Sequence, residues 1–91
     1  MSFSKIDLTN DDWTLIGDNV TSITFQNASQ WSFYVNFNTS NTSPNTAIGL
    51  IYSAGQGELK KTVTALTYQT TPNYVFARAV SSTARIIVET S

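Results

Sequence analysis

Large apolar residues stand at every second position in most of the apolar segments of this chain. The clearest run covers residues 31–37 and carries its large side chains at alternate positions: Trp31, Phe33, Val35 and Phe37. Successive side chains of a β-strand point to opposite faces, so this spacing predicts a strand that buries all four in a core. Residues 20–25 repeat the pattern, with Ile23 and Phe25 on one face.

The remaining apolar segments are short and are separated by turns rich in Asn, Gly, Ser and Pro: residues 13–16, 47–52, 59–68, 74–79 and 84–89. Short turns predict two hairpins, one joining 13–16 to 20–25 and one joining 74–79 to 84–89. No segment has the spacing of an amphipathic helix. The prediction is an all-β fold, a single antiparallel β-sandwich of immunoglobulin-like or jelly-roll type with about seven or eight short strands.

Three local features refine this prediction. Residues 39–45 are the longest polar stretch and contain Pro44, which is typical of a mobile surface loop. Gly49 interrupts an apolar segment and indicates a bulge or the close approach of a neighbouring strand. The alternation weakens within 59–68, so a bend or a change of register is expected near 64–67.

The first twelve residues are more polar than the rest, although Phe3, Ile6 and Leu8 are interspersed among them. Two interpretations are open, an N-terminal arm or a short edge strand. We expect an arm over 1–12 that is ordered by what it binds, followed by the β-sandwich domain over 13–91. Deletion of residues 1–10 should then leave the sandwich folded and weaken assembly.

Length and net charge limit the classes of partner that the chain is expected to bind. The chain has 91 residues, no cysteine and a net charge of −1, so it forms one small domain without disulfides. Oligomerisation is the accessible source of extra buried area, and we expect a homo-oligomer, a trimer or a dimer. The charge disfavours nucleic acid as a partner, and no apolar run is long enough to cross a membrane. The start lacks the apolar core of a signal peptide, which favours synthesis in the cytoplasm.

Catalysis is disfavoured because the chain has no histidine and no cysteine. These residues supply most neutral-pH acid–base chemistry and most transition-metal ligands. Asp11 and Asp12 follow Asn10, but they lack the spacing of a calcium loop and indicate an acidic turn. We therefore expect no enzyme activity, no cofactor and no bound metal.

Binding residues are easier to nominate than catalytic ones. Arg78 lies within an apolar strand segment, where its charge must reach solvent, form a pair or cross an interface. Tyr34 points away from the face that carries Phe33 and Val35, so it is an exposed platform or an interface contact. Exposed aromatic rings also suggest a carbohydrate-binding sandwich, although the alternation assigns Trp31 to the core.

The end of the chain resembles a known family. Asn73-Tyr74-Val75-Phe76-Ala77-Arg78-Ala79, a Ser/Thr turn, and Ala84-Arg85-Ile86-Ile87-Val88-Glu89 are similar to the ending of small virion proteins of tailed bacteriophages. Trp13-Thr14-Leu15-Ile16-Gly17 and Ile23-Thr24-Phe25-Gln26-Asn27 are similar to their opening segments. Together these segments comprise 23 of the 91 residues. Phe76 stands where Tyr is common, and residues 30–66 carry no matching motif.

The resemblance implies a structural, usually multimeric protein of the virion with no catalytic residue. We expect a decoration (cement) or fibre-base module that binds the major capsid protein, made in the host bacterial cytoplasm. Alternatives are a carbohydrate-binding β-sandwich and a tail or head–tail adaptor component; an oligonucleotide-binding barrel is weakest because a basic groove is missing. The residues expected to contact partners are Phe3, Ile6, Leu8, Tyr34 and Arg78.

Overall fold

The computed structural model describes residues 3–46, 48–66 and 73–90. Within them the chain forms strands and a single 3₁₀ turn, η1 (Val63–Ala65). The strands are β1 (Ser4–Thr9), β2 (Thr14–Gly17), β3 (Ser22–Asn27), β4 (Phe33–Asn38), β5 (Leu50–Tyr52), β6 (Gly57–Thr62), β7 (Tyr74–Ala79) and β8 (Thr83–Thr90). The predicted strand over 59–68 thus starts earlier, at Gly57, and ends at Thr62, directly before η1 and close to the expected bend. Residues 67 and 68 of that prediction lie outside the described residues.

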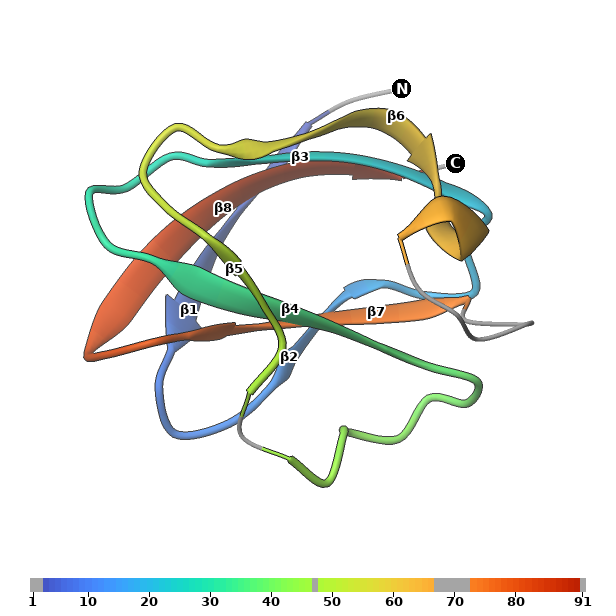
Figure 1. Ribbon diagram of the computed structural model, residues 1–91, viewed down its shortest axis with the longest axis horizontal. Coiled ribbons are helices and arrows are strands. Elements are labelled where there is room, and N and C mark those ends of the chain that lie inside the picture. The colour runs from blue at the N-terminus through green and yellow to red at the C-terminus, as the bar shows by residue number, and fades with distance from the viewer. Residues whose placement is uncertain (1–2, 47, 67–72, 91) are drawn as a thin grey trace.

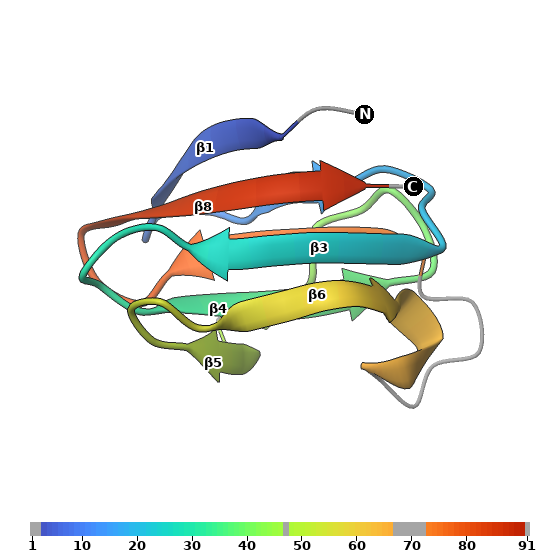
Figure 2. The ribbon, with the colours of Figure 1, turned by 90° about the horizontal axis from the view of Figure 1, so that it is seen from above.

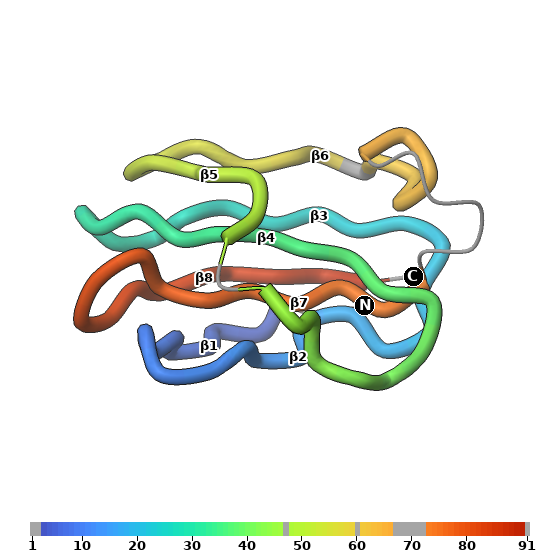
Figure 3. The backbone as a smooth tube through the Cα atoms, turned by 60° about the horizontal axis from the view of Figure 1, so that its bottom comes forward, coloured from blue at the N-terminus to red at the C-terminus, as the bar shows by residue number. Residues whose placement is uncertain are grey.

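The strands form two packed antiparallel sheets, with the orders β1-β8-β3-β6 and β2-β7-β4-β5. Figure 1 shows the sheets as two layers, and Figure 2 shows the first sheet from above with its four strands side by side. In Figure 3, β5 and β6 lie along one side of the sandwich and β1 and β2 along the other. The all-β antiparallel sandwich predicted from the alternation is confirmed.

The pairing order identifies the topology. The first described strand pairs with the last, and the pairing continues inward as β2 with β7, β3 with β6, and β4 with β5. The chain is thus one long hairpin folded over on itself, and the ladders β3–β8 and β4–β7 join the pairs into sheets. This is the jelly-roll arrangement, not the immunoglobulin-like one.

Both predicted hairpins are wrong. β2 and β3 belong to opposite sheets, and so do β7 and β8. Each connection crosses between the layers and contains a residue with positive φ, Asn19 at 55° and Ser82 at 58°. Turn-forming residues look the same whether the chain returns beside its own strand or passes to the other layer, so the sequence pattern did not separate the two cases.

The core lies between the sheets and contains an aromatic cluster of Phe25, Phe33 and Tyr52. Tyr52 packs edge-on against Phe25 with ring centroids 4.8 Å apart, and Phe33 lies 6.2 Å from Phe25. The inward positions predicted for Ile23, Phe25, Phe33, Val35 and Phe37 are confirmed, since all are buried. Trp31 is the exception: 54% of it is exposed because β4 begins only at Phe33.

The expectation of a separate N-terminal arm is wrong for the described residues of that segment. Ser4–Thr9 is the edge strand β1, paired with β8 from Ser4 opposite Val88 to Thr9 opposite Thr83. The physical reason is the alternation: Leu8 is fully buried in the core and Ile6 packs against it, whereas Lys5 and Asp7 are exposed. The sandwich therefore begins before residue 13.

Close backbone approaches and one loop complete the fold. A Cβ on Gly49 would collide with the carbonyl oxygen of Val35, which confirms the close approach expected at this glycine. The polar loop 39–46 runs below the β2-β7-β4-β5 sheet in Figure 1. It is held there by the Trp13 indole, whose Nε1 donates to the carbonyl of Thr46 at 2.7 Å, and Trp13 is buried outside the central core cluster.

Replacement of Leu8 by alanine tests whether β1 is intrinsic to the domain. Because Leu8 is fully buried, Leu8→Ala should lower the free energy of unfolding by about 2–5 kcal/mol, measured by urea denaturation. Phe3→Ala is the control, since Phe3 is 62% exposed and should change stability little. If both substitutions changed the free energy of unfolding equally little, the segment would be a separate arm and not a strand of the domain.

Tyr52 predicts a loss of stability in alkali. Burial, together with the hydrogen bond from its hydroxyl to Glu58 Oε2 (3.0 Å) and the charge of that carboxylate, raises the pKa of Tyr52 far above its ordinary value of 10.0. Above pH 10.0 the unfolded hydroxyl therefore loses its proton while the folded one keeps it. The free energy of unfolding should fall by up to about 1.4 kcal/mol per pH unit from this group.

The Tyr52→Phe variant isolates this contribution. Urea denaturation of both proteins at neutral pH and at several alkaline pH values should show a shallower alkaline loss in the variant. Identical pH profiles would mean that Tyr52 does not control alkaline stability.

Candidate functional site

Two residues predicted to contact partners, Tyr34 and Arg78, lie side by side on the outer face of the β2-β7-β4-β5 sheet. Tyr34 on β4 is in register with Arg78 on β7 and, on its other side, with Ile51 on β5. The neighbours of Tyr34 along β4, Phe33 and Val35, are buried in the core. The alternation along β4 therefore turns Tyr34 outward, and the register places Ile51, Tyr34 and Arg78 in one cross-strand row.

The Arg78 guanidinium is held in place by a backbone carbonyl. Its Nε and Nη2 both donate to the carbonyl oxygen of Asn10, at 3.0 and 2.7 Å. Asn10 belongs to the turn that connects β1 to β2, so Arg78 on β7 ties this turn to the sheet. A fixed guanidinium that keeps further N–H groups for a partner loses less side-chain entropy on binding than a mobile one.

The row continues into an exposed apolar edge at β5. Three large side chains there remain substantially exposed: Ile48 (63%), Leu50 (46%) and Ile51 (57%). β5 is one of the two edge strands of its sheet. Ile51 shares the outer face with Tyr34, whereas Leu50 is opposite the buried Val35 and lies at the open edge of the inner face. We define the β5 surface as this exposed edge (Ile48, Leu50 and Ile51) together with Tyr34 and Arg78.

The edge strand on the other side of the sandwich has a different character. β1 exposes Lys5 and Asp7, and charged side chains on an edge discourage pairing with another chain. β5 has no charged residue, and its outward side chain is Ile51. Clustered apolar exposure next to Tyr and Arg is typical of a protein–protein contact surface.

The other three predicted contact residues are not part of this surface. Leu8 is buried in the core, and the partly buried Ile6 packs against it, so both side chains face inward. Phe3 is exposed and lines a hollow of about 390 Å³ on the first sheet, together with Leu59 and Ile87. The five predicted residues therefore separate into two inward, one on the first sheet and two on the β5 surface.

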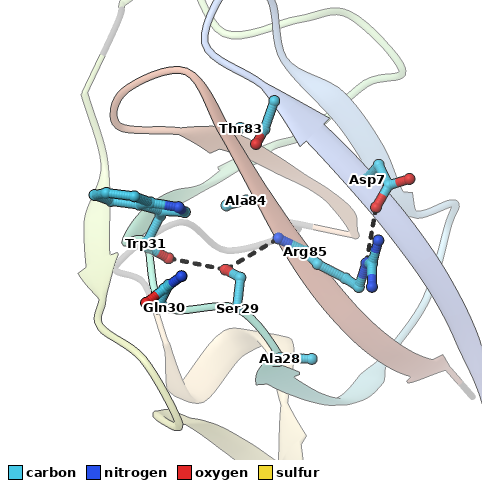
Figure 4. Close-up of a pocket in the computed structure, with 8 residues that line it drawn as sticks. All are labelled: Asp7, Ala28, Ser29, Gln30, Trp31, Thr83, Ala84 and Arg85. Carbon is cyan, nitrogen blue, oxygen red and sulfur yellow. Dashed lines mark hydrogen bonds and ion pairs between the residues drawn. The ribbon is translucent and has the colours of Figure 1, made fainter.

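A second surface feature is a hollow of about 630 Å³ that is lined by Asp7, Ala28, Ser29, Gln30, Trp31, Thr83, Ala84 and Arg85. We call it the Trp31 hollow. In Figure 4 the Trp31 ring stands on one side, Ala84 lies in the middle, and Asp7 and Arg85 stand on the other side. Arg85 Nε donates to Asp7 Oδ1 at 2.9 Å, and both side chains are largely exposed.

The segment that carries Trp31 is held by the side chain of Asn27, the last residue of β3, which is only 2% exposed. Its Nδ2 donates to the carbonyl oxygens of Trp31 (2.7 Å) and Tyr52 (3.0 Å). Its Oδ1 accepts from the backbone N–H of Ser29 at 2.9 Å and lies 2.7 Å from Ser29 Oγ. The buried amide is therefore satisfied on both sides, as burial of a polar group requires.

The same segment is also attached to β8. The N–H of Ala28 donates to the carbonyl oxygen of Arg85 at 2.9 Å, and the N–H of Arg85 donates to Ser29 Oγ at 3.2 Å. Residues 28–31 are thus fixed from two directions, which gives Trp31 a rigid base.

Sequence reasoning missed Asn27. A signal was present, because Ile23, Phe25 and Asn27 share one face by alternation, and a polar residue on a core face must find partners. The identity of those partners depended on the passage of the chain from β3 in one sheet to β4 in the other.

The acidic side chains in the described part of the chain are dispersed. The described residues contain no group of three or more His, Cys, Asp or Glu side chains that could hold a metal ion. Asp12 Oδ1 accepts from the N–H of Trp13 at 2.8 Å, so Asp12 belongs to a local turn. No helix over 3–46, 48–66 and 73–90 is long and apolar enough to cross a membrane.

Comparisons with known proteins give no relative. No family model matches the sequence, and neither the curated proteins nor the solved structures contain a match.

Replacement of Asn27 should lower the free energy of unfolding more than is usual for an asparagine at the end of a strand. Asn27→Ala removes the hydrogen bonds to Trp31, Tyr52 and Ser29 and leaves buried backbone groups unpaired, so urea denaturation should show a loss of about 2–4 kcal/mol. Asn38→Ala is the matched control, because the Asn38 amide donates to Thr42 in an exposed position. Its expected loss is below about 1 kcal/mol, and similar losses in both variants would contradict the role of Asn27.

Proposed function

We propose that this chain is a structural virion protein of a tailed bacteriophage. In this proposal it is a capsid decoration or fibre-base module that self-associates and binds the major capsid protein. The observation that carries the proposal is the β5 surface: an uncharged edge strand with exposed Leu50 and Ile51, preceded by exposed Ile48, with Ile51 in one row with Tyr34 and Arg78.

The resemblance in the sequence supports the same proposal. The segments at the end of the chain that resemble small virion proteins form β7 and β8, and each is an inner strand of its sheet. Arg78 therefore belongs to the part of the chain that carries the resemblance, whereas Tyr34 and Ile51 of the same row lie in residues 30–66, which carry no matching motif. Jelly-roll sandwiches are also a recurrent architecture of capsid proteins, although the same fold occurs in lectins.

The estimated free energy of burying the β5 surface favours binding through many repeated copies over one tight contact between two molecules. Full burial of an Ile or Leu side chain contributes about 1.5–3 kcal/mol, so covering the exposed half of three such residues contributes roughly 2–4 kcal/mol. Association costs about 4–15 kcal/mol in lost freedom. Main-chain hydrogen bonds at the β5 edge and contacts of Tyr34 and Arg78 must add to the apolar contribution. Repeated copies on a particle surface then convert weak contacts into stable binding.

Self-association can be tested with one variant of the β5 surface and one matched control elsewhere. Ile51→Asp places a charge on the β5 surface and should raise the dissociation constant of the dimer or trimer at least about tenfold. Size exclusion coupled to light scattering over micromolar to millimolar protein should show this shift, with an unchanged circular dichroism spectrum. Phe3→Asp is the control, since Phe3 is 62% exposed and Ile51 57%, and they lie on different sheets.

Two outcomes would contradict the proposal. One is a wild-type protein that is monomeric over this concentration range and does not co-sediment with capsids assembled from the major capsid protein of the same genome. The other is dissociation caused by Phe3→Asp and not by Ile51→Asp, which would move the interface to the opposite sheet.

A further inference from the structure

We infer that the Trp31 hollow is a binding site for a neutral saccharide. The inference goes beyond the proposed assembly role and does not depend on it, because the hollow shares no residue with the β5 surface. It is carried by an exposed tryptophan on a rigid segment, with a donor–acceptor pair across the hollow.

The exposed Trp31 is a costly feature that the fold maintains. More than half of Trp31 is exposed, although an aromatic ring of this size normally contributes to a core. Its carbonyl oxygen accepts from Asn27 Nδ2 at 2.7 Å and lies 3.1 Å from Ser29 Oγ. The backbone beneath the ring is therefore fixed before any ligand arrives, which lowers the entropic cost of binding. The C–H face of a pyranose ring is apolar and stacks on such a ring.

The polar groups opposite Trp31 match the hydroxyl groups of a sugar. Arg85 uses Nε for its bond to Asp7 Oδ1, so its Nη groups and Asp7 Oδ2 stand as a donor and an acceptor beside each other. Neighbouring hydroxyls on a sugar ring can donate to the carboxylate and accept from the guanidinium at once. The Gln30 amide lies on the Trp31 side of the hollow and the Thr83 hydroxyl above its middle in Figure 4, and both can bind further hydroxyls.

The charge balance selects a neutral ligand. Asp7 and Arg85 neutralise each other, and the other lining residues are uncharged. An anionic sugar or a phosphate would meet the Asp7 carboxylate next to the guanidinium and gain little. The volume of about 630 Å³ falls within the roughly 300–1,000 Å³ of small-molecule sites, which is room for a short oligosaccharide.

Binding can be measured with defined oligosaccharides. The probes are glucose, galactose, mannose and N-acetylglucosamine tetramers, with a galacturonic acid tetramer as the anionic comparison. The readouts are tryptophan fluorescence and the NMR shift of the Trp31 indole N–H. At least one neutral tetramer should bind in the micromolar to millimolar range and move the Trp31 signal, and the anionic tetramer should bind more weakly.

Three variants locate the site. Trp31→Ala should weaken the bound tetramer by at least about tenfold, as expected for an aromatic anchor. Gln30→Ala should weaken it several-fold, and because Gln30 is exposed it should leave the fold unchanged. Phe3→Ala removes an exposed aromatic ring elsewhere and should leave binding unchanged.

The inference is overturned if no neutral tetramer moves the Trp31 signal at millimolar concentration, or if binding survives Trp31→Ala. It is also overturned if the galacturonic acid tetramer binds best. Loss of self-association in Trp31→Ala without any sugar binding would assign the hollow to a protein interface. The assembly proposal has its own test in Ile51→Asp, so either proposal can fail alone.

Discussion

The rest of the structure depends on the buried side-chain amide of Asn27, which binds the segment that crosses from one sheet to the other. Asn27 ends β3, and the chain must then cross to the other layer to begin β4 at Phe33. The side chain of Asn27 binds the crossing segment at Ser29 and Trp31 and also binds the end of β5 at Tyr52. Its backbone adds bonds to the β5–β6 turn, from its N–H to Gln56 and from the Gly55 N–H to its carbonyl. One residue thus holds two connections at this end of the sandwich, the β3–β4 crossing and the β5–β6 turn, and the end of β5.

A jelly roll has four edge strands that could pair with another chain, and this protein protects them from such pairing to different degrees. Along β1 the exposed side chains include Lys5 and Asp7, which oppose edge-to-edge pairing. Along β5 and β6 the interior is closed by Tyr52, whose ring packs on Phe25 and whose hydroxyl reaches Glu58 on β6. Tyr52 closes the interior there, yet Leu50 at the open edge, Ile51 on the outer face and the preceding Ile48 all stay exposed. An edge whose core is closed but whose apolar side chains stay exposed is suited to binding a partner that buries those side chains.

The alternation of apolar residues was sufficient for the fold class and for most of the core, because burial on one face of a strand leaves a direct trace in the sequence. It was not sufficient where the answer depended on the other layer. The supposed hairpins were crossovers, since the turns after Gly17 and Ala79 have the same residue types in either arrangement. The alternation in β1 was present, but only its pairing with β8, distant in sequence, decides whether Leu8 is buried. Tyr34 and Arg78 were nominated from their faces, whereas Ile51 joins them through register alone.

Trp31 shows how the end of a strand converts a core pattern into a surface site. By alternation it belongs with Phe33 and Val35, but it precedes β4 by two residues, and there the segment is bound to Asn27 and to β8. The ring is consequently displaced from the interior onto the surface, where it lines the same hollow as Asp7 and Arg85. A jelly roll places several crossovers at each end of its sandwich, so residues that leave a strand there can form a site without disturbing the core. The β5 surface, in contrast, lies on the sheet itself, where the strand register holds its row. The two surfaces can therefore change independently, one through loop residues and the other through an edge strand.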